Sequence, residues 1–157
     1  MKQEKTNVMR ILESAHLEYV SHEYDPTITD GETVAKLTNI EPERCFKTLV
    51  TVGNDLNHYV FVIPVNCSLD LKKAAKSVGV KNVEMIKQKE LFPLTGYVHG
   101  GCSSIGMKKK FVTRIDETAI LFDKIAFSGG KIGVQVEMDP LVLCDFIEAK
   151  FVDLTKN

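Results

Sequence analysis

The sequence predicts a mixed α/β fold, with α+β as the alternative, in a single domain that spans residues 1–157. The chain has 157 residues, a length that suits one domain burying about 68–70% of its unfolded surface. Its composition, 44% hydrophobic and 26% charged, is ordinary for a globular protein and excludes general disorder. Short strand-like runs alternate with helical segments, and at least two neighbouring runs resemble hairpins, which favours a mixed sheet over a purely parallel one.

The N-terminal third predicts three helices and one strand. Alternation over residues 19–24 indicates a short strand. Residues 29–32 offer a capping box for a helix that ends near Leu37, and Pro42 suits the first turn of another short helix. The first helix is expected after Thr6 and Asn7, its two candidate caps, because apolar residues recur there at helical spacing: Val8, Ile11, Leu12 and Ala15.

Residues 45–52 and 58–65 give the strongest local prediction. Both runs are rich in β-branched and aromatic residues, and the turn-forming segment 53–57 separates them. This arrangement predicts an antiparallel hairpin.

The middle of the chain predicts a helix, a strand and a second helix. Ser68 is the expected N-cap of the first helix, and Gly79 is its expected end. Residues 81–86 read as a strand, and residues 87–92 read as a short helix. The apolar stripe of the first helix comprises Leu71, Ala74, Ala75 and Val78.

The C-terminal part completes the expected sheet. Strands are predicted at residues 111–115, 120–127 and 132–137. Pro140 opens a last helix that runs to about residue 147, and residues 151–154 read as a final strand.

The formal charge of −1 excludes binding driven by bulk electrostatics, so any nucleic-acid partner must be held by a local patch. No stretch approaches the roughly 18 apolar residues of a membrane span. Residues 1–5 precede no apolar run, so no secretory signal is expected and a cytoplasmic location is the default. The cysteines form no CxxC pair and the histidines no HExxH motif, so no metal site is expected.

Lys47 is the first candidate for a functional residue. It lies in a strand whose other residues are mostly apolar, and lysine is rarely buried without a partner. Its ammonium group suits a phosphate, a carboxylate or a polarised carbonyl. From the pattern alone, an edge-strand lysine that discourages aggregation is somewhat the better interpretation.

The glycine-rich segment 96–106 is the second candidate. Gly100 and Gly101 allow backbone N–H groups to approach an anion or an oxyanion, and Ser103 and Ser104 add hydroxyl donors. Glycine pairs more often form simple turns, and this segment has no nucleotide-binding fingerprint.

Two further segments are weaker candidates. The turn that contains Ser128 and Lys131 has small residues that could admit a ligand, although a hairpin turn explains it equally well. The basic run 108–110 could meet phosphates, but such runs are more often simply solvated.

Cys102 and His99 are close enough in sequence to suggest a nucleophile and its base. No third orienting group is evident, so an ordinary loop cysteine is the better interpretation. No other nucleophile motif is present, and an enzyme with this sequence would act mainly by positioning and electrostatics.

Several motifs together are similar to one known family, and they keep the same order: residues 46–50, 69–76, 83–85, 95–101, 105–109 and 128–131. On these motifs the chain resembles the YbaK/EbsC family of bacterial aminoacyl-tRNA deacylases, which is related to the editing domain inserted in prolyl-tRNA synthetases. The resemblance covers nearly the whole length.

The resemblance implies a single domain with a mixed, barrel-like sheet flanked by helices, and no metal or organic cofactor. It implies removal of cysteine from mischarged Cys-tRNA(Pro), in which the substrate's own thiol attacks the ester and leaves as a cyclic thiolactone. The implied partner is the aminoacyl end of the tRNA, with prolyl-tRNA synthetase as a further candidate partner.

The resemblance also assigns residues by motif. Lys47 matches the family's essential lysine, and Gly100 and Gly101 fall on the loop that approaches the aminoacyl group, so these three are the expected catalytic residues. The expected substrate-binding residues are Tyr24, Thr48, Ser103, Ser128 and Lys131.

Two segments depart from the family pattern. Cys102-Ser103-Ser104 stands where the family commonly has Ile-Ser-Pro, and Ile132 replaces an arginine of the later turn. The second change removes a cation near the expected site. The alternatives are a hydrolytic deacylase of Ala-tRNA(Pro) or another mischarged tRNA, and a non-catalytic regulatory protein that binds a nucleotide or a partner.

Overall fold

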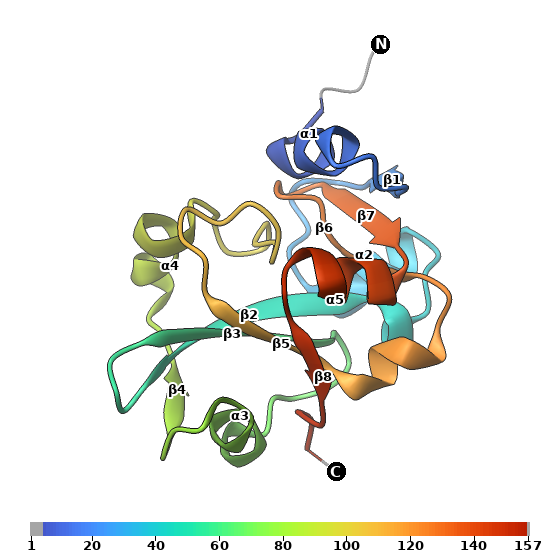
Figure 1. The fold of residues 1–157 in the computed structure, drawn as a ribbon. Helices are drawn as coiled ribbons and strands as arrows, with labels where there is room; N and C mark the ends of the chain where they lie inside the picture. Colours follow the sequence, from blue (N-terminus) through green and yellow to red (C-terminus); the bar gives the residue numbers. More distant parts are fainter. Residues whose placement is uncertain (1–4, 157) are drawn as a thin grey trace.

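A computed structural model describes residues 5–156, and their strands form two sheets (Figure 1). The smaller sheet is antiparallel, and its strand order is β1 (Val20–Glu23), β7 (Val134–Met138) and β6 (Ile125–Ser128). The larger sheet has the order β4 (Val83–Met85), β2 (Phe46–Gly53), β3 (His58–Pro64), β5 (Val112–Asp116) and β8 (Lys150–Val152).

The larger sheet confirms the predicted mixed topology. Strands β2 and β3 form the predicted antiparallel hairpin, whereas β5 runs parallel to both β3 and β8. A parallel bridge between Cys45 and Ala126 connects the two sheets. Within residues 5–156 neither sheet closes into a barrel, so the expected barrel-like arrangement takes the form of two adjoining sheets.

Five α-helices and two 3-10 helices connect these strands within the described residues. Of the two candidate caps of helix α1, Thr6 is the actual one, because its hydroxyl accepts a hydrogen bond from the Met9 N–H, and Asn7 is the first helical residue. The α-helices are α1 (Asn7–Ser14), α2 (Gly31–Leu37), α3 (Leu71–Val78), α4 (Gln88–Thr95) and α5 (Pro140–Phe146), and the 3-10 helices are η1 (Pro42–Arg44) and η2 (Glu117–Leu121).

The predicted N-cap of α3 is wrong. Asp70, not Ser68, caps this helix, because its carboxylate accepts hydrogen bonds from the backbone N–H groups of Lys72 and Lys73. A carboxylate also interacts favourably with the helix dipole, which a serine hydroxyl does only weakly.

The strand predicted over residues 120–127 is also wrong in its first half. The Asp116 carboxylate accepts hydrogen bonds from the N–H and hydroxyl of Thr118 and so caps the 3-10 helix η2. Strand β6 therefore begins only at Ile125. Helix α4 extends three residues past the predicted end, through Pro93, and Gly96 ends it with a φ of +84°.

The hydrophobic core lies on both faces of β3. Val62 belongs to the larger cluster, which packs the two sheets together with α1 and α5. Phe61 and Ile63 belong to a second cluster, which α3 covers from the opposite face (Figure 1). Because neighbouring strand residues point to opposite faces, this two-sided burial accounts for the continuous apolar run of the second hairpin strand.

Residues 1–4 and 157 lie outside the described part of the chain. The expectation that no secretory signal is present rested on residues 1–5, so most of that segment also lies outside it. Across the described part, each helix is too short or too polar to cross a membrane.

Candidate functional site

A cavity of about 360 Å³ lies beside the first half of β2. Its wall combines residues of β2, the start of α2, the glycine-rich loop and the ends of β6 and β7. Five of the residues predicted from the sequence line this cavity: Tyr24, Lys47, Thr48, Gly100 and Ser128. Folding therefore brings together candidates that lie as much as a hundred positions apart.

Lys47 supplies a free cation to the cavity wall. Its backbone pairs with Ile63 of β3, whereas β4 pairs with β2 only at residues 51–53. The side chain is partly exposed, and its ammonium group forms no hydrogen bond or ion pair with the residues that the structure describes. Lys47 also acts on the Asp30 carboxylate, whose pKa is held low mainly by hydrogen bonds from Thr33 and to a small extent by Lys47. Lys47 is thus available to bind an anionic or polarised oxygen.

Thr48 supplies a buried hydroxyl to the same wall. Its Oγ1 atom is inaccessible to solvent and has no hydrogen-bond partner among the described residues. Leaving such a group unsatisfied costs about 1–3 kcal/mol, and buried polar groups are satisfied in the great majority of cases. Because Thr48 also lines the cavity, a rotation of its side chain would present this hydroxyl to a ligand there.

Tyr24 and Ser128 lie on the strand ends that close the cavity. The Tyr24 N–H donates to the Gly133 carbonyl at 2.9 Å, and burial raises the pKa of the Tyr24 phenol. The Ser128 hydroxyl accepts from the Gly130 N–H at 3.1 Å, which leaves its own proton free to donate. The turn at residues 129–133 therefore holds the backbone of Tyr24 and the side chain of Ser128.

The glycine-rich loop packs directly against that turn. A Cβ atom on Gly100, which has a φ of +89°, would lie 3.0 Å from Thr29 Cγ2. A Cβ atom on Gly101 would lie 3.0 Å from the Ile132 backbone nitrogen. Only glycine permits both approaches without displacement of the loop. Ile132, where the sequence departs from the family pattern, is thus part of the contact that holds the loop.

Three predicted site residues lie outside the cavity wall. The Gly101 N–H is bonded to the Val98 carbonyl, and Ser103 is fully buried with its Oγ accepting from the Ile105 N–H. Lys131 is exposed on the turn. Their expected roles, catalytic for Gly101 and substrate-binding for the other two, remain predictions.

Cys102 also lines the cavity, and so does His99. Burial raises the pKa of Cys102 to about 12, despite an opposing hydrogen bond with Thr95. A thiol with this pKa is protonated at neutral pH, and the thiolate is the reactive form. Cys102 is therefore unsuited to act as a nucleophile, in agreement with its interpretation as an ordinary loop cysteine.

For the deacylation that the family resemblance implies, we expect Cys102→Ala to change the rate by less than about twofold, because a thiol that stays protonated does not attack an ester. The measurement is ester loss from mischarged tRNA under single-turnover conditions. A severe loss of activity in a folded Cys102→Ala protein would contradict this expectation and restore the pair with His99.

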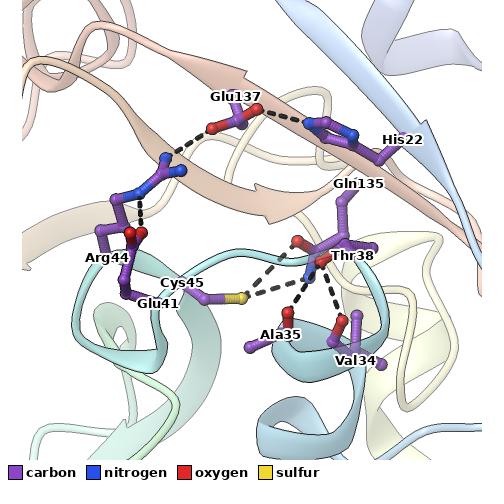
Figure 2. A network of polar contacts seen from close by, with 9 residues as sticks. All are labelled: His22, Val34, Ala35, Thr38, Glu41, Arg44, Cys45, Gln135 and Glu137. Carbon is purple, nitrogen blue, oxygen red and sulfur yellow. Dashed lines mark hydrogen bonds and ion pairs between the residues drawn. The ribbon is translucent and has the colours of Figure 1, made fainter.

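A polar network links strands β1 and β7 to the segment that precedes β2 (Figure 2). Glu137 of β7 bonds to His22 of β1 and to Arg44 of η1, and Arg44 also pairs with Glu41. Burial opposes ionisation of the Glu137 carboxyl, but the hydrogen bonds from Arg44 and His22 outweigh it and hold its pKa below the usual value. The network therefore ties the smaller sheet to the segment that leads into β2.

Gln135 extends this support to the cavity itself. Its side-chain amide contacts the Cys45 sulfur through both its oxygen, at 3.6 Å, and its nitrogen, at 3.4 Å (Figure 2). Gln135 also lines the cavity, beside residues 46–49 of β2. Sequence reasoning overlooked Gln135, Glu137 and Arg44, although two polar residues within the otherwise apolar strand 134–138 were a usable signal.

The chemistry available in the cavity is that of positioning. It offers one free cation, one hydroxyl without a partner and a rigid glycine loop. Within residues 5–156, no three His, Cys, Asp or Glu side chains are grouped so that they could hold a metal ion.

Comparison with known proteins gives a consistent result. Residues 25–146 match the family described as the aminoacyl-tRNA editing domain. The chain is 44% identical over 155 residues to EbsC of Enterococcus faecalis, a match that covers 98% of this chain and 94% of that protein. EbsC carries a provisional assignment as a Cys-tRNA(Pro)/Cys-tRNA(Cys) deacylase.

Two solved structures share the fold. A protein described as a candidate trans-editing enzyme for prolyl tRNA synthetase superposes with a TM-score of 0.84 at 24% identity, over 99% of this chain and 100% of that one. The hypothetical protein APE2540 superposes with a TM-score of 0.87 at 21% identity, over 95% of this chain and 99% of that one. At these identities the two structures establish the fold alone.

Proposed function

The chain belongs to the aminoacyl-tRNA editing domain family, and from this membership we propose that it is a trans-editing deacylase that removes cysteine from mischarged Cys-tRNA(Pro). The observation that carries the proposal is the free Lys47 ammonium group in a cavity whose only thiol, among the described residues, is held protonated. Such a site can orient an ester and polarise it, but it does not supply a thiolate of its own.

The cavity suits the aminoacyl end of a tRNA. Its volume of about 360 Å³ lies at the lower end of the range of about 300–1,000 Å³ found for small-molecule sites. A site of this size fits the terminal nucleotide with its amino acid and leaves the acceptor stem outside. With a net charge of −1, the protein would bind the rest of the tRNA weakly, and a prolyl-tRNA synthetase partner could supply tRNA identity.

The proposed reaction uses the thiol of the substrate. The sulfur attacks the carbonyl carbon of the ester, so that a C–S bond forms and the C–O bond to the ribose breaks. The ribose oxygen takes up the proton released by the thiol, and the products are a cyclic thiolactone and a tRNA with a free terminal hydroxyl. No external nucleophile, oxidant or reductant is needed.

The protein's part in this reaction is electrostatic and geometric. The Lys47 ammonium group would stabilise negative charge on the terminal phosphate or on the ester oxygen. The Thr48 hydroxyl would bond to the bound aminoacyl end. The Gly100 loop would confine the cysteinyl group so that its thiol approaches the carbonyl, which raises the effective concentration of the nucleophile. The cytoplasm, where aminoacyl-tRNAs are made, is the proposed location.

The function is tested with proline tRNA charged separately with cysteine, alanine and proline. We expect the cysteinyl ester to be lost at least about 100-fold faster than the other two, because only cysteine carries the nucleophile and effective molarities of such groups are large. Ester loss is followed by acid precipitation, and the thiolactone is identified by mass spectrometry.

Two other outcomes would replace this proposal. Faster loss of alanine would identify a hydrolytic deacylase that uses water. If all three esters were stable even with prolyl-tRNA synthetase present, the protein would instead be a regulator that binds a nucleotide or a partner.

A further inference from the structure

Positive charge is concentrated in one segment beside the cavity. Residues 87–110 contain five of the 20 Lys and Arg residues of the chain but only one of its 21 Asp and Glu residues. The same segment contributes Leu91, His99, Gly100 and Cys102 to the cavity wall. The near-neutral protein thus carries a local basic surface next to its candidate site.

An exposed aromatic ring lies within this basic surface. Phe92 of α4 directly follows Leu91, and 56% of its surface is exposed. The Lys108 ammonium group lies 5.1 Å from the centroid of the Phe92 ring. This geometry is a cation–π contact, in which the cation is attracted to the electron-rich ring.

The backbone holds Lys108 in this place. Its N–H donates to the Thr95 carbonyl at 3.1 Å, which ties the end of the glycine-rich loop to the end of α4. A Cβ atom on Gly96 would lie 3.4 Å from Lys108 Cγ, so the missing side chain lets the lysine stem pass close to the helix end. In contrast, Lys110 of the same basic run is engaged with Glu148.

We propose that Phe92 and Lys108 form a stacking platform for the unpaired nucleotide next to the terminal adenosine of the tRNA. This inference rests on the proposed function, because it assumes that the aminoacyl-adenosine end occupies the adjoining cavity. A base would stack on the exposed part of the ring, and Lys108 and Lys109 would meet the phosphates. Sequence-tolerant binding of single strands uses this combination of aromatic ring and cations.

The positive charge near Phe92 favours a nucleotide over a segment of a protein partner as the ligand of this surface. A helix or strand of a protein partner would bury an apolar face, whereas Phe92 has the Lys108 ammonium group over its ring and Lys89 three residues before it on the same helix. A single-stranded nucleic acid matches both the lysines, through its phosphates, and the exposed ring, through its bases.

The platform is tested with an uncharged single-stranded RNA that ends in CCA and carries 2-aminopurine in place of the base next to the terminal adenosine. Stacking on Phe92 should quench its fluorescence. We expect Phe92→Ala and Phe92→Leu to weaken binding by about 5- to 150-fold, the range for loss of one stacked base, and Phe92→Trp to retain it. Leu121→Ala, at another exposed apolar side chain in η2, is the matched control.

The probe carries no ester, so this result does not depend on catalysis. Quenching that persists in Phe92→Ala, or that falls equally in Leu121→Ala, would overturn the platform. Platform binding without deacylation of any charged tRNA would instead overturn the proposed function and leave the platform supported.

A kinetic measurement tests the same inference in the active protein. Phe92→Ala should raise KM for Cys-tRNA(Pro) but leave KM for 3′-O-cysteinyl-adenosine unchanged, because the short substrate lacks the stacked nucleotide. An equal rise in KM for both substrates would overturn the assignment of Phe92 to the neighbouring nucleotide.

Discussion

Lys47→Ala is expected to lower kcat/KM for Cys-tRNA(Pro) by about 100- to 1,000-fold, the loss typical of removing one electrostatic stabiliser from an active site. The cavity wall contains this ammonium group without an ion-pair partner among the described residues, so the charge is free to act on the substrate. For the same reason the substitution breaks no ion pair within the described structure. The free energy of unfolding should therefore change by less than about 0.5 kcal/mol.

Two variants accompany this measurement. Lys47→Arg keeps the charge and should recover part of the activity, although a planar guanidinium replaces a compact ammonium group. Lys72→Ala removes an exposed lysine of α3, away from the cavity wall, and should have no effect on turnover. Unchanged turnover in Lys47→Ala would return this residue to the role of a strand lysine that limits aggregation.

Thr48→Val is expected to change activity and stability in opposite directions. Valine has nearly the shape of threonine but lacks the hydroxyl that has no partner in the unliganded cavity. Its removal should raise the free energy of unfolding by about 1 kcal/mol, because an unsatisfied buried group is lost. The same change should lower kcat/KM by about 5- to 150-fold, since the bound aminoacyl end loses a hydrogen bond in a buried place. Denaturant unfolding and single-turnover deacylation measure the two effects.

Thr51→Val provides a matched control on the same strand. The Thr51 hydroxyl is fully buried, but it donates to the Tyr59 carbonyl at 3.0 Å. Here the substitution should destabilise the protein by about 1–3 kcal/mol and leave the kinetics of the folded enzyme unchanged. If Thr48→Val destabilised the protein as Thr51→Val does, or left activity intact, the proposed role of the Thr48 hydroxyl would be wrong.

Much of the fold could be predicted because its determinants are local. The β-branched and aromatic residues of β2 and β3 and the turn between them specified the hairpin, and helical spacing of apolar residues specified α1. The errors lie where side chains compete for a backbone group. Asp70 displaced Ser68 as a cap, and Asp116 bent a predicted strand into η2.

The candidate site was less predictable from the sequence. Lys47 was conspicuous as a cation in an apolar strand, but its pattern alone favoured a role in solubility. Its place in a shared cavity with Thr48 and Gly100 depends on contacts between distant segments. The supporting residues Arg44 and Glu137 lie 93 positions apart, and no local periodicity relates them.

The sequence by itself determined the strand and helix content, the low net charge and the absence of a recognisable nucleophile motif, because these depend on composition and on neighbouring residues. Only the tertiary structure decided which candidates share a cavity, which polar groups remain without a partner and which thiol has its pKa raised by burial. Those properties depend on burial and on the approach of segments far apart in the chain. The charge of −1 likewise conceals a basic surface that becomes meaningful only once α4 and the glycine-rich loop lie beside the cavity.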